Sequence, residues 1–181
     1  WLDARRADAA ARLALAPLPS ADEEVWRYSP IDALDLAAFG PVVAPDLDPD
    51  RDRALADALV PDRAALVVVV DGHVATVELA DRSAGAGVAV GRATEVATGE
   101  AVLGAGAGLD DHFGLLNDAH APDPVVVDVP RGVALDAPIV VVHRTRSEGA
   151  LALPRLAVRL GDGAQATVVD GATSMRVSAP A

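Results

Sequence analysis

The sequence predicts an α+β fold: a helical and mixed α/β region over residues 1–124, then the first coils of a β-helix (β-solenoid) over residues 125–181. The first observation is a repeat, because the pattern of residues 127–135 returns in residues 158–166. In both copies two apolar residues flank a charged one, a turn contains glycine, and a second short run follows. A strand–turn–strand unit that recurs at a fixed offset is typical of a coil that stacks on copies of itself.

The second observation is the composition, since 51% of the residues are hydrophobic but only 3% are aromatic. The core must therefore be built from Val, Leu and Ala, as in a sheet or solenoid of small branched side chains.

Helices are expected in four places in the first 60 residues: 1–16, 20–28, 29–39 and 48–60. Proline ends the first of these, because it cannot continue a helix. Ser20 and Glu23 fit a capping box, in which each side chain satisfies a backbone donor at the start of a helix. Ser29 and Pro30 are typical of an N-cap and a first helical residue.

Strands are expected in two groups. The apolar run 65–70 is followed by Asp71-Gly72, a two-residue hairpin signal, and returns through residues 74–79. Further strands are expected near 88–90, 125–129, 133–135, 138–143, 153–160 and 164–170. Residues 109–119 predict a helix, while the weak pattern of residues 92–108 is interpreted as a degenerate helix followed by a Gly/Ala loop.

Composition excludes several classes of protein. The formal net charge is -12, and the basic residues form no stripe that could follow a phosphate backbone, so no nucleic-acid partner is expected. Cysteine is absent, which excludes disulfides and thiolate ligands within these residues. No run approaches the ~20 apolar residues of a membrane span, and no signal segment is visible, so a cytoplasmic protein without a membrane partner is expected.

No catalytic, cofactor-binding or metal-binding residue is expected. The glycines of residues 104–108 lack the third glycine of a dinucleotide fingerprint, and the chain has no lysine for a phosphate loop, which favours a linker. His112 and His120 are eight residues apart, or ~80° around a helix. His73 and His143 have no partner at metal-ligand spacing.

Four segments, in order, resemble the SufB/SufD family, the scaffold proteins of the SUF iron–sulfur cluster assembly system. Residues 22–36 resemble its N-terminal signature, carried here by Glu24, Trp26, Arg27, Tyr28 and Pro30. Residues 66–72 resemble its apolar strand leading into a hairpin. Residues 113–119, with Leu116 and Asn117, resemble its Phe-x-x-Leu-Asn-x-Ala helix, and residues 127–138, with Pro130 and Gly132, resemble its entry into a β-helix. The Trp-Arg-Tyr-Ser-Pro sequence is closer to the SufD branch.

The resemblance implies a non-catalytic partner in a complex with SufB-like and SufC-like proteins. An iron–sulfur cluster is implied for the full complex, but no cofactor for these residues, because the family's cluster-associated residues and SufC-binding helices are expected beyond residue 181. Trp26 and Tyr28 are expected to anchor the N-terminal helices, since aromatic side chains supply large buried areas. The alternative is that they form a partner-binding patch.

Two other functions stay open. A secreted β-helix carbohydrate-active enzyme would need clustered acids and aromatic side chains that stack on sugars, yet the chain has two Trp, one Tyr and two Phe. A structural solenoid without a role in cluster assembly is the third possibility.

Overall fold

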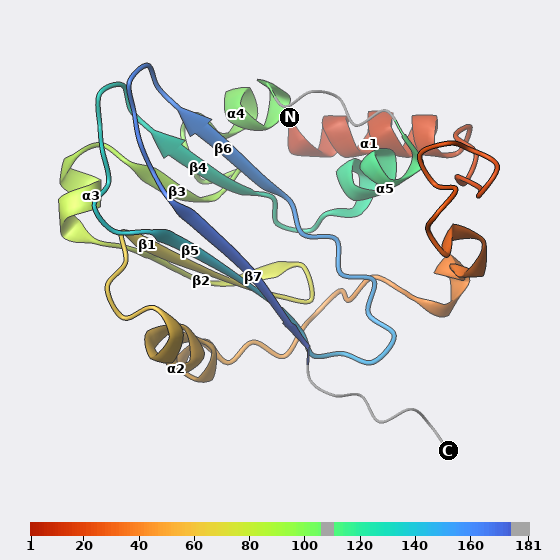
Figure 1. The fold of residues 1–181 in the computed structure, drawn as a ribbon, viewed down its shortest axis with the longest axis horizontal. Coiled ribbons are helices and arrows are strands. Elements are labelled where there is room, and N and C mark those ends of the chain that lie inside the picture. Colours follow the sequence, from red (N-terminus) through yellow and green to blue (C-terminus); the bar gives the residue numbers. More distant parts are fainter. Residues whose placement is uncertain (106–110, 175–181) are drawn as a thin grey trace.

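The computed structural model describes residues 1–105 and 111–174, without the side chains of residues 49, 52, 55, 56 and 59. Its helices are α1 (Leu2–Leu13), α2 (Pro49–Leu59), α3 (Asp81–Gly85), α4 (Gly99–Ala105) and α5 (His112–His120), with single 3₁₀ turns η1 (Ile31–Ala33) and η2 (Leu36–Ala38). Its strands are β1 (Ala65–Val70), β2 (His73–Leu79), β3 (Ala89–Arg92), β4 (Val125–Val129), β5 (Ile139–Thr145), β6 (Leu156–Leu160) and β7 (Val168–Ser174) (Figure 1).

The strands form two mixed sheets. One has the order β2-β1-β5-β7 and the other the order β3-β4-β6. Strands β1 and β2 are antiparallel, as are β3 and β4, whereas β5 and β7 run parallel to β1 and β6 runs parallel to β4. Both sheets contain strands from each side of residue 124, and the proposed division of the chain at that point stays a prediction.

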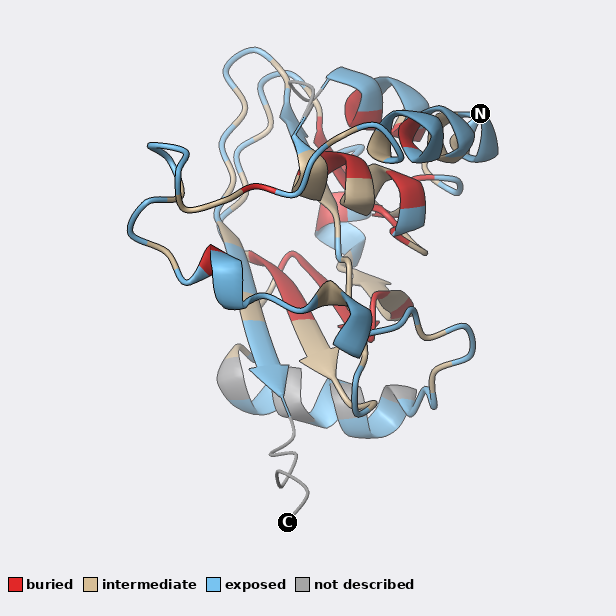
Figure 2. Ribbon diagram, turned by 90° about the vertical axis from the view of Figure 1, so that its right-hand side faces the viewer, coloured by how far each residue is buried: buried red, intermediate tan, exposed pale blue. Residues whose placement is uncertain are grey.

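The core lies in layers. Alternate residues of β1, β4 and β5 face the space between the sheets, where Val67, Val127 and Ile139 are fully buried. The opposite face of β1, with Leu66 and Val68, packs on Val60 at the end of α2. On the far side of the other sheet, Val126 packs against α4. Because both faces of β1 and β4 are covered, their sequences are continuous apolar runs, which is typical of buried strands; Figure 2 shows them in red.

The hairpin between β1 and β2 is confirmed. Asp71 has φ 50° and Gly72 has φ 89°, the pair of positive values that the favoured two-residue hairpin turn requires. Asp71 is also buried, and its carboxylate accepts hydrogen bonds from the main-chain N–H groups of Arg146 and Ser147 and from the Ser147 hydroxyl at 2.7 Å. The turn therefore holds the loop that follows β5.

The β-helix prediction is wrong. The two repeat copies do stack in parallel, since Val127 pairs with Val158 and Val129 with Leu160. However, β2 and β3 continue the sheets with antiparallel pairs, and the part of the chain that the structure describes contains no solenoid or closed sheet. The strand expected at 133–135 is only an isolated bridge between Ala134 and Gln165. The fold is a small α+β domain with two mixed sheets.

Two helices predicted before residue 40 are also wrong. Residues 20–29 form successive turns, in which Glu23, Trp26 and Ser29 each donate a main-chain hydrogen bond to the residue three before. Ser29 donates its hydroxyl to the carbonyl of Trp26 instead of capping a helix, and only the 3₁₀ turns η1 and η2 follow. The apolar side chains that such helices would bury stay exposed, with Val25 at 86% and Tyr28 at 91%, so packing does not stabilise a helix there.

The helix expected within residues 92–108 is α4, but the linker predicted over residues 104–108 is wrong for Gly104, which is helical. Residues 106–108 of that prediction lie outside the described part of the chain. The helix predicted over 109–119 is α5, which begins at His112 because the Asp111 carboxylate accepts the N–H of Gly114 at 2.7 Å as an N-cap. Residues 109 and 110 also lie outside the described part.

Candidate functional site

Two segments of the family resemblance meet in space. The rings of Trp26 and Phe113 are 5.4 Å apart and inclined by 61°, an edge-to-face contact. Beside them, Nδ1 of His112 lies 3.1 Å from the carbonyl oxygen of Ala16, which joins α5 to the chain that follows α1. The N-terminal signature is thus held against α5 by an aromatic contact, the geometry that aromatic pairs prefer.

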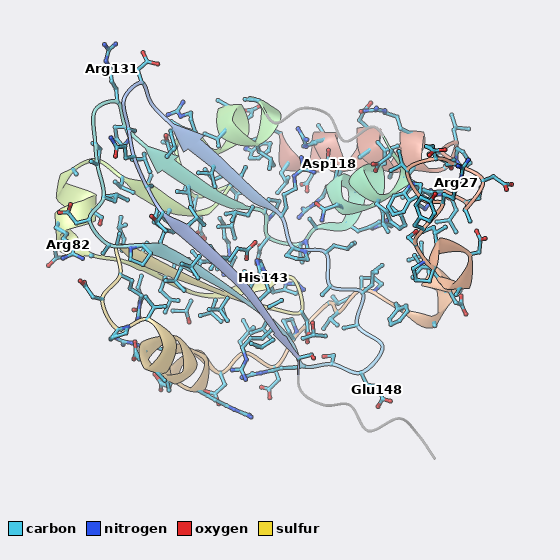
Figure 3. All side chains as sticks on the ribbon, in the orientation of Figure 1. Arg27, Arg82, Asp118, Arg131, His143 and Glu148 are labelled. Atoms are coloured by element: carbon cyan, nitrogen blue, oxygen red, sulfur yellow. The ribbon has the colours of Figure 1, made fainter. Side chains whose placement is uncertain are left out.

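The next turn of α5 carries an acid that joins three parts of the fold. Asp118 binds Arg5 of α1 through Oδ2 at 2.7 Å and Arg155, just before β6, through Oδ1 at 2.6 Å. The side chains of Asp118 and Arg155 are only 15% and 11% exposed, so this pair is little screened by solvent. Asn117 adds a hydrogen bond from Nδ2 to the carbonyl of Pro154 at 2.9 Å. Figure 3 shows Asp118 between α1 and α5.

An open groove of about 870 Å³ runs between α4, α5 and β6. Its apolar wall includes Leu103, Phe113 and Leu156, and its polar groups include Asp111, Asn117, Arg155 and Arg159. Each of the charged groups already has a structural partner, since Asp111 caps α5, Arg155 binds Asp118 and Arg159 binds Asp128. The groove therefore offers an apolar surface whose charged groups are paired, and its described residues bring no nucleophile and base together.

The Asp128–Arg159 pair lies beside this groove on neighbouring strands. Arg159 donates from Nε and Nη2 to the two carboxylate oxygens, and Thr98 donates its hydroxyl to Oδ2 at 2.6 Å. Burial raises the pKa of the Asp128 carboxyl, but the hydrogen bonds from Arg159 and Thr98 and the positive charge outweigh it and leave the pKa below its usual value. The hydrogen bonds to Asp128 likewise raise the pKa of Arg159.

The residues predicted from the family resemblance do not form one site. Glu24 and Arg27 form an exposed ion pair at 2.9 Å, and Tyr28 is 91% exposed. Pro30 precedes η1, and Leu116 is half-buried on α5. By contrast, Pro130 and Gly132 lie in the turn after β4, on either side of Arg131 in the sequence. Figure 3 shows Arg131 far from Arg27.

The histidines make separate contacts. Nε2 of His143 lies 2.9 Å from Oδ1 of Asp170, and Nε2 of His73 lies 2.6 Å from the carbonyl of Val42. Within residues 1–105 and 111–174 no three His, Asp or Glu side chains converge in a way that could hold a metal ion. Because the whole sequence lacks cysteine, thiolate ligands for an iron–sulfur cluster would have to come from another polypeptide or from residues outside this sequence.

The ion pairs that organise this region were not predicted. Asp128 and Arg159 occupy the same position in the two repeat copies and have opposite charges, so the repeat itself carried a signal for that pair. Asp118 and Arg5 are 113 residues apart and have no sequence pattern in common.

Comparison with known protein families finds no family model that matches the chain. Comparison with curated proteins finds no match either. Among the helices that the structure describes, none has the length and apolar character needed to cross a membrane. The chain is thus a small α+β domain, and the described residues of its candidate site form an apolar groove and several ion pairs.

Proposed function

We propose that this chain is a non-catalytic component of a cytoplasmic iron–sulfur cluster assembly scaffold of the SufB/SufD type, and that it works with SufB-like and SufC-like proteins. The cluster is the cargo of that assembly. The proposal rests on sequence segments and not on architecture, because the two mixed sheets differ from the β-helix that the resemblance implies.

The observation that carries the proposal is the contact between Trp26 and Phe113. Trp26 lies in the segment 22–36 and Phe113 in the segment 113–119, two of the four segments that resemble the family. Asn117, also in residues 113–119, donates a hydrogen bond to the carbonyl of Pro154 just before β6. Two segments that resemble a family because they maintain its structure are expected to contact each other in the folded protein, as Trp26 and Phe113 do.

The sheet edges support a role in protein association. Among the strands that the structure describes, β6 and β7 are each the last strand of a sheet. In the parallel ladder, Val125 donates to the carbonyl of Arg155 and Gly161 donates to the carbonyl of Val129. In a parallel ladder, alternate residues of β6 bond to β4, so the N–H and C=O groups of Val158 point to the side of β6 that faces away from β4. A strand of a partner protein can pair with these groups there.

Carbohydrate hydrolysis is disfavoured by the groove. Such enzymes use two carboxyl groups about 5–9.5 Å apart that flank the scissile bond. Among the groove-lining residues that the structure describes, Asp111 is the one with a carboxylate, and that group caps α5.

Co-expression with SufB-like and SufC-like proteins from the same genome tests the proposal. We expect a stable three-protein complex by size-exclusion chromatography, and we expect Val158→Lys to weaken it, because a lysine on an edge strand opposes pairing. The thermal unfolding of the variant checks that it is folded. The proposal would be wrong if the chain elutes alone and if cells that lack this protein keep normal activity of their iron–sulfur enzymes.

A further inference from the structure

Residues 15–47, which connect α1 to α2 and are called the outer segment here, carry an unusual surface. Large apolar side chains that are exposed in the described part of the chain are concentrated there: Leu15, Leu18, Val25, Tyr28, Leu34, Phe39, Val43 and Leu47. The exposed fractions reach 86% at Val25 and 91% at Tyr28. The outer segment is the red-to-orange chain at the right and lower right of Figure 1. Concentrations of exposed apolar side chains mark interaction sites on soluble proteins.

The outer segment is attached to the domain mainly through its main chain. Gly40 donates to the carbonyl of Gly149 at 2.9 Å and accepts from the N–H of Leu151 at 2.7 Å. The carbonyl of Val42 binds His73, and the carbonyl of Asp46 accepts from Nη1 of Arg146 at 2.7 Å.

Few of its side chains take part in this attachment. Trp26 contacts Phe113, and Ile31 is buried at 6% exposure. Between these fixed points the apolar side chains face solvent, although main-chain contacts already hold the backbone in place. A surface that is fixed before binding loses less conformational entropy when it binds.

The outer segment is also acidic. Its charged residues are one arginine, Arg27, and six carboxylates: Asp22, Glu23, Glu24, Asp32, Asp35 and Asp46. Apolar side chains surrounded by negative charge complement a face that is apolar and basic.

We propose that the outer segment, including the exposed Val25 and Tyr28, is a docking surface for a protein partner that presents a basic, apolar face. A second copy of the chain fits poorly, because it would bring two acidic segments together in a protein of net charge -12. An anionic membrane would repel the same carboxylates. The inference is independent of the proposed role in iron–sulfur assembly, since it rests on exposure, attachment and charge alone.

Titration of the 181-residue chain with a fluorescent helical peptide of leucine and lysine tests this surface, and a matched peptide of leucine and glutamate is the control. Fluorescence anisotropy gives the dissociation constant, and amide NMR shifts locate the contact. We expect shifts in residues 15–47 and binding that weakens as salt rises.

Two double variants separate the contribution of the apolar side chains to peptide binding from that of the negative charges. Val25→Ser with Tyr28→Ser is expected to raise the dissociation constant for the lysine peptide at least about tenfold, because exposed tyrosines often dominate interfaces. Asp22→Asn with Asp46→Asn is expected to reduce the salt dependence. The matched control, Leu160→Ser with Val169→Ser, removes exposed apolar groups from β6 and β7 and is expected to change the dissociation constant by less than about twofold.

Three results would overturn the proposal. The first is that the Val25→Ser, Tyr28→Ser variant binds the lysine peptide as the wild type does, or that the glutamate peptide binds equally well. The second is a dimer in analytical ultracentrifugation that this variant abolishes, which would make a second copy the occupant. The third is binding to lipid vesicles, zwitterionic or anionic, that depends on Tyr28.

Discussion

Two hydrogen bonds join Arg159 to Asp128 across the parallel strands β6 and β4, Nε to Oδ1 at 2.7 Å and Nη2 to Oδ2 at 2.5 Å. A second arginine–aspartate pair, Arg131 and Asp162, joins the turns that follow these strands at 3.4 Å. Both pairs span 31 residues, the offset of the sequence repeat. They differ in environment, because the Asp128 side chain is 9% exposed and the Asp162 side chain is 87% exposed.

The buried position of Asp128 predicts a large difference between these two acids. Asp128→Ala is expected to lower the free energy of unfolding by about 1–3 kcal/mol, because it removes three hydrogen bonds to a charged group and leaves Thr98 without its acceptor. Asp162→Ala is the matched control and is expected to cost less than about 1 kcal/mol, as exposed ion pairs do. Urea unfolding measures both. Equal losses would contradict the role assigned to burial.

The lowered pKa of Asp128 predicts a pH dependence of stability. A carboxyl whose pKa is lower when folded binds protons more readily when unfolded, so its contribution is complete above the unfolded pKa of about 3.9 and is lost as the pH falls through the folded pKa. The stability difference between wild type and Asp128→Asn should therefore be constant from pH 7 to 5 and shrink below pH 4. In an Arg159→Gln background the pH dependence should be weaker. A difference that grows on acidification would show that the sign is wrong.

Elements whose signals are local could be predicted. The strand at 65–70 and its Asp71-Gly72 turn follow from an apolar run and a turn sequence that favours positive φ. The helix α1 ends before Pro17, as proline requires. The repeat also gave the register of β4 and β6, since its offset places Val127 opposite Val158.

Features set by distant contacts could not be predicted. The pairing of β1 with β5 joins residues more than 70 positions apart, and nothing in either apolar run identifies its partner. The antiparallel pairing of β3 with β4 joins residues more than 30 positions apart and was not predicted for the same reason. In the candidate site, Asp118 binds Arg5 and Arg155 only because the fold brings α1, α5 and β6 together.

Close packing of the two repeat turns predicts that Gly161 tolerates no side chain. A Cβ at this position would lie 2.4 Å from the backbone nitrogen of Arg131 and 2.8 Å from its Cα, where backbone must move. Gly161→Ala is expected to destabilise the protein by about 1–3 kcal/mol, as overpacking does. Gly171→Ala, in β7 with no atom within 4 Å of the new Cβ, is the control and should be neutral or stabilising by up to about 1 kcal/mol. Thermal unfolding distinguishes them, and an unaffected Gly161→Ala protein would contradict this packing.

The contact of Trp26 with Phe113 predicts an energetic coupling that its exposed neighbour lacks. A double-mutant cycle of Trp26→Ala and Phe113→Ala should give a coupling of about 0.5–1.5 kcal/mol, because an edge-to-face pair contributes beyond its buried area. Tyr28→Ala replaces a side chain that is 91% exposed and should change stability by less than about 0.5 kcal/mol. Its cycle with Phe113→Ala should show additive losses. If Tyr28 coupled to Phe113 as strongly as Trp26 does, it would have a structural role, and the assignment of Tyr28 to a docking surface would lose its basis.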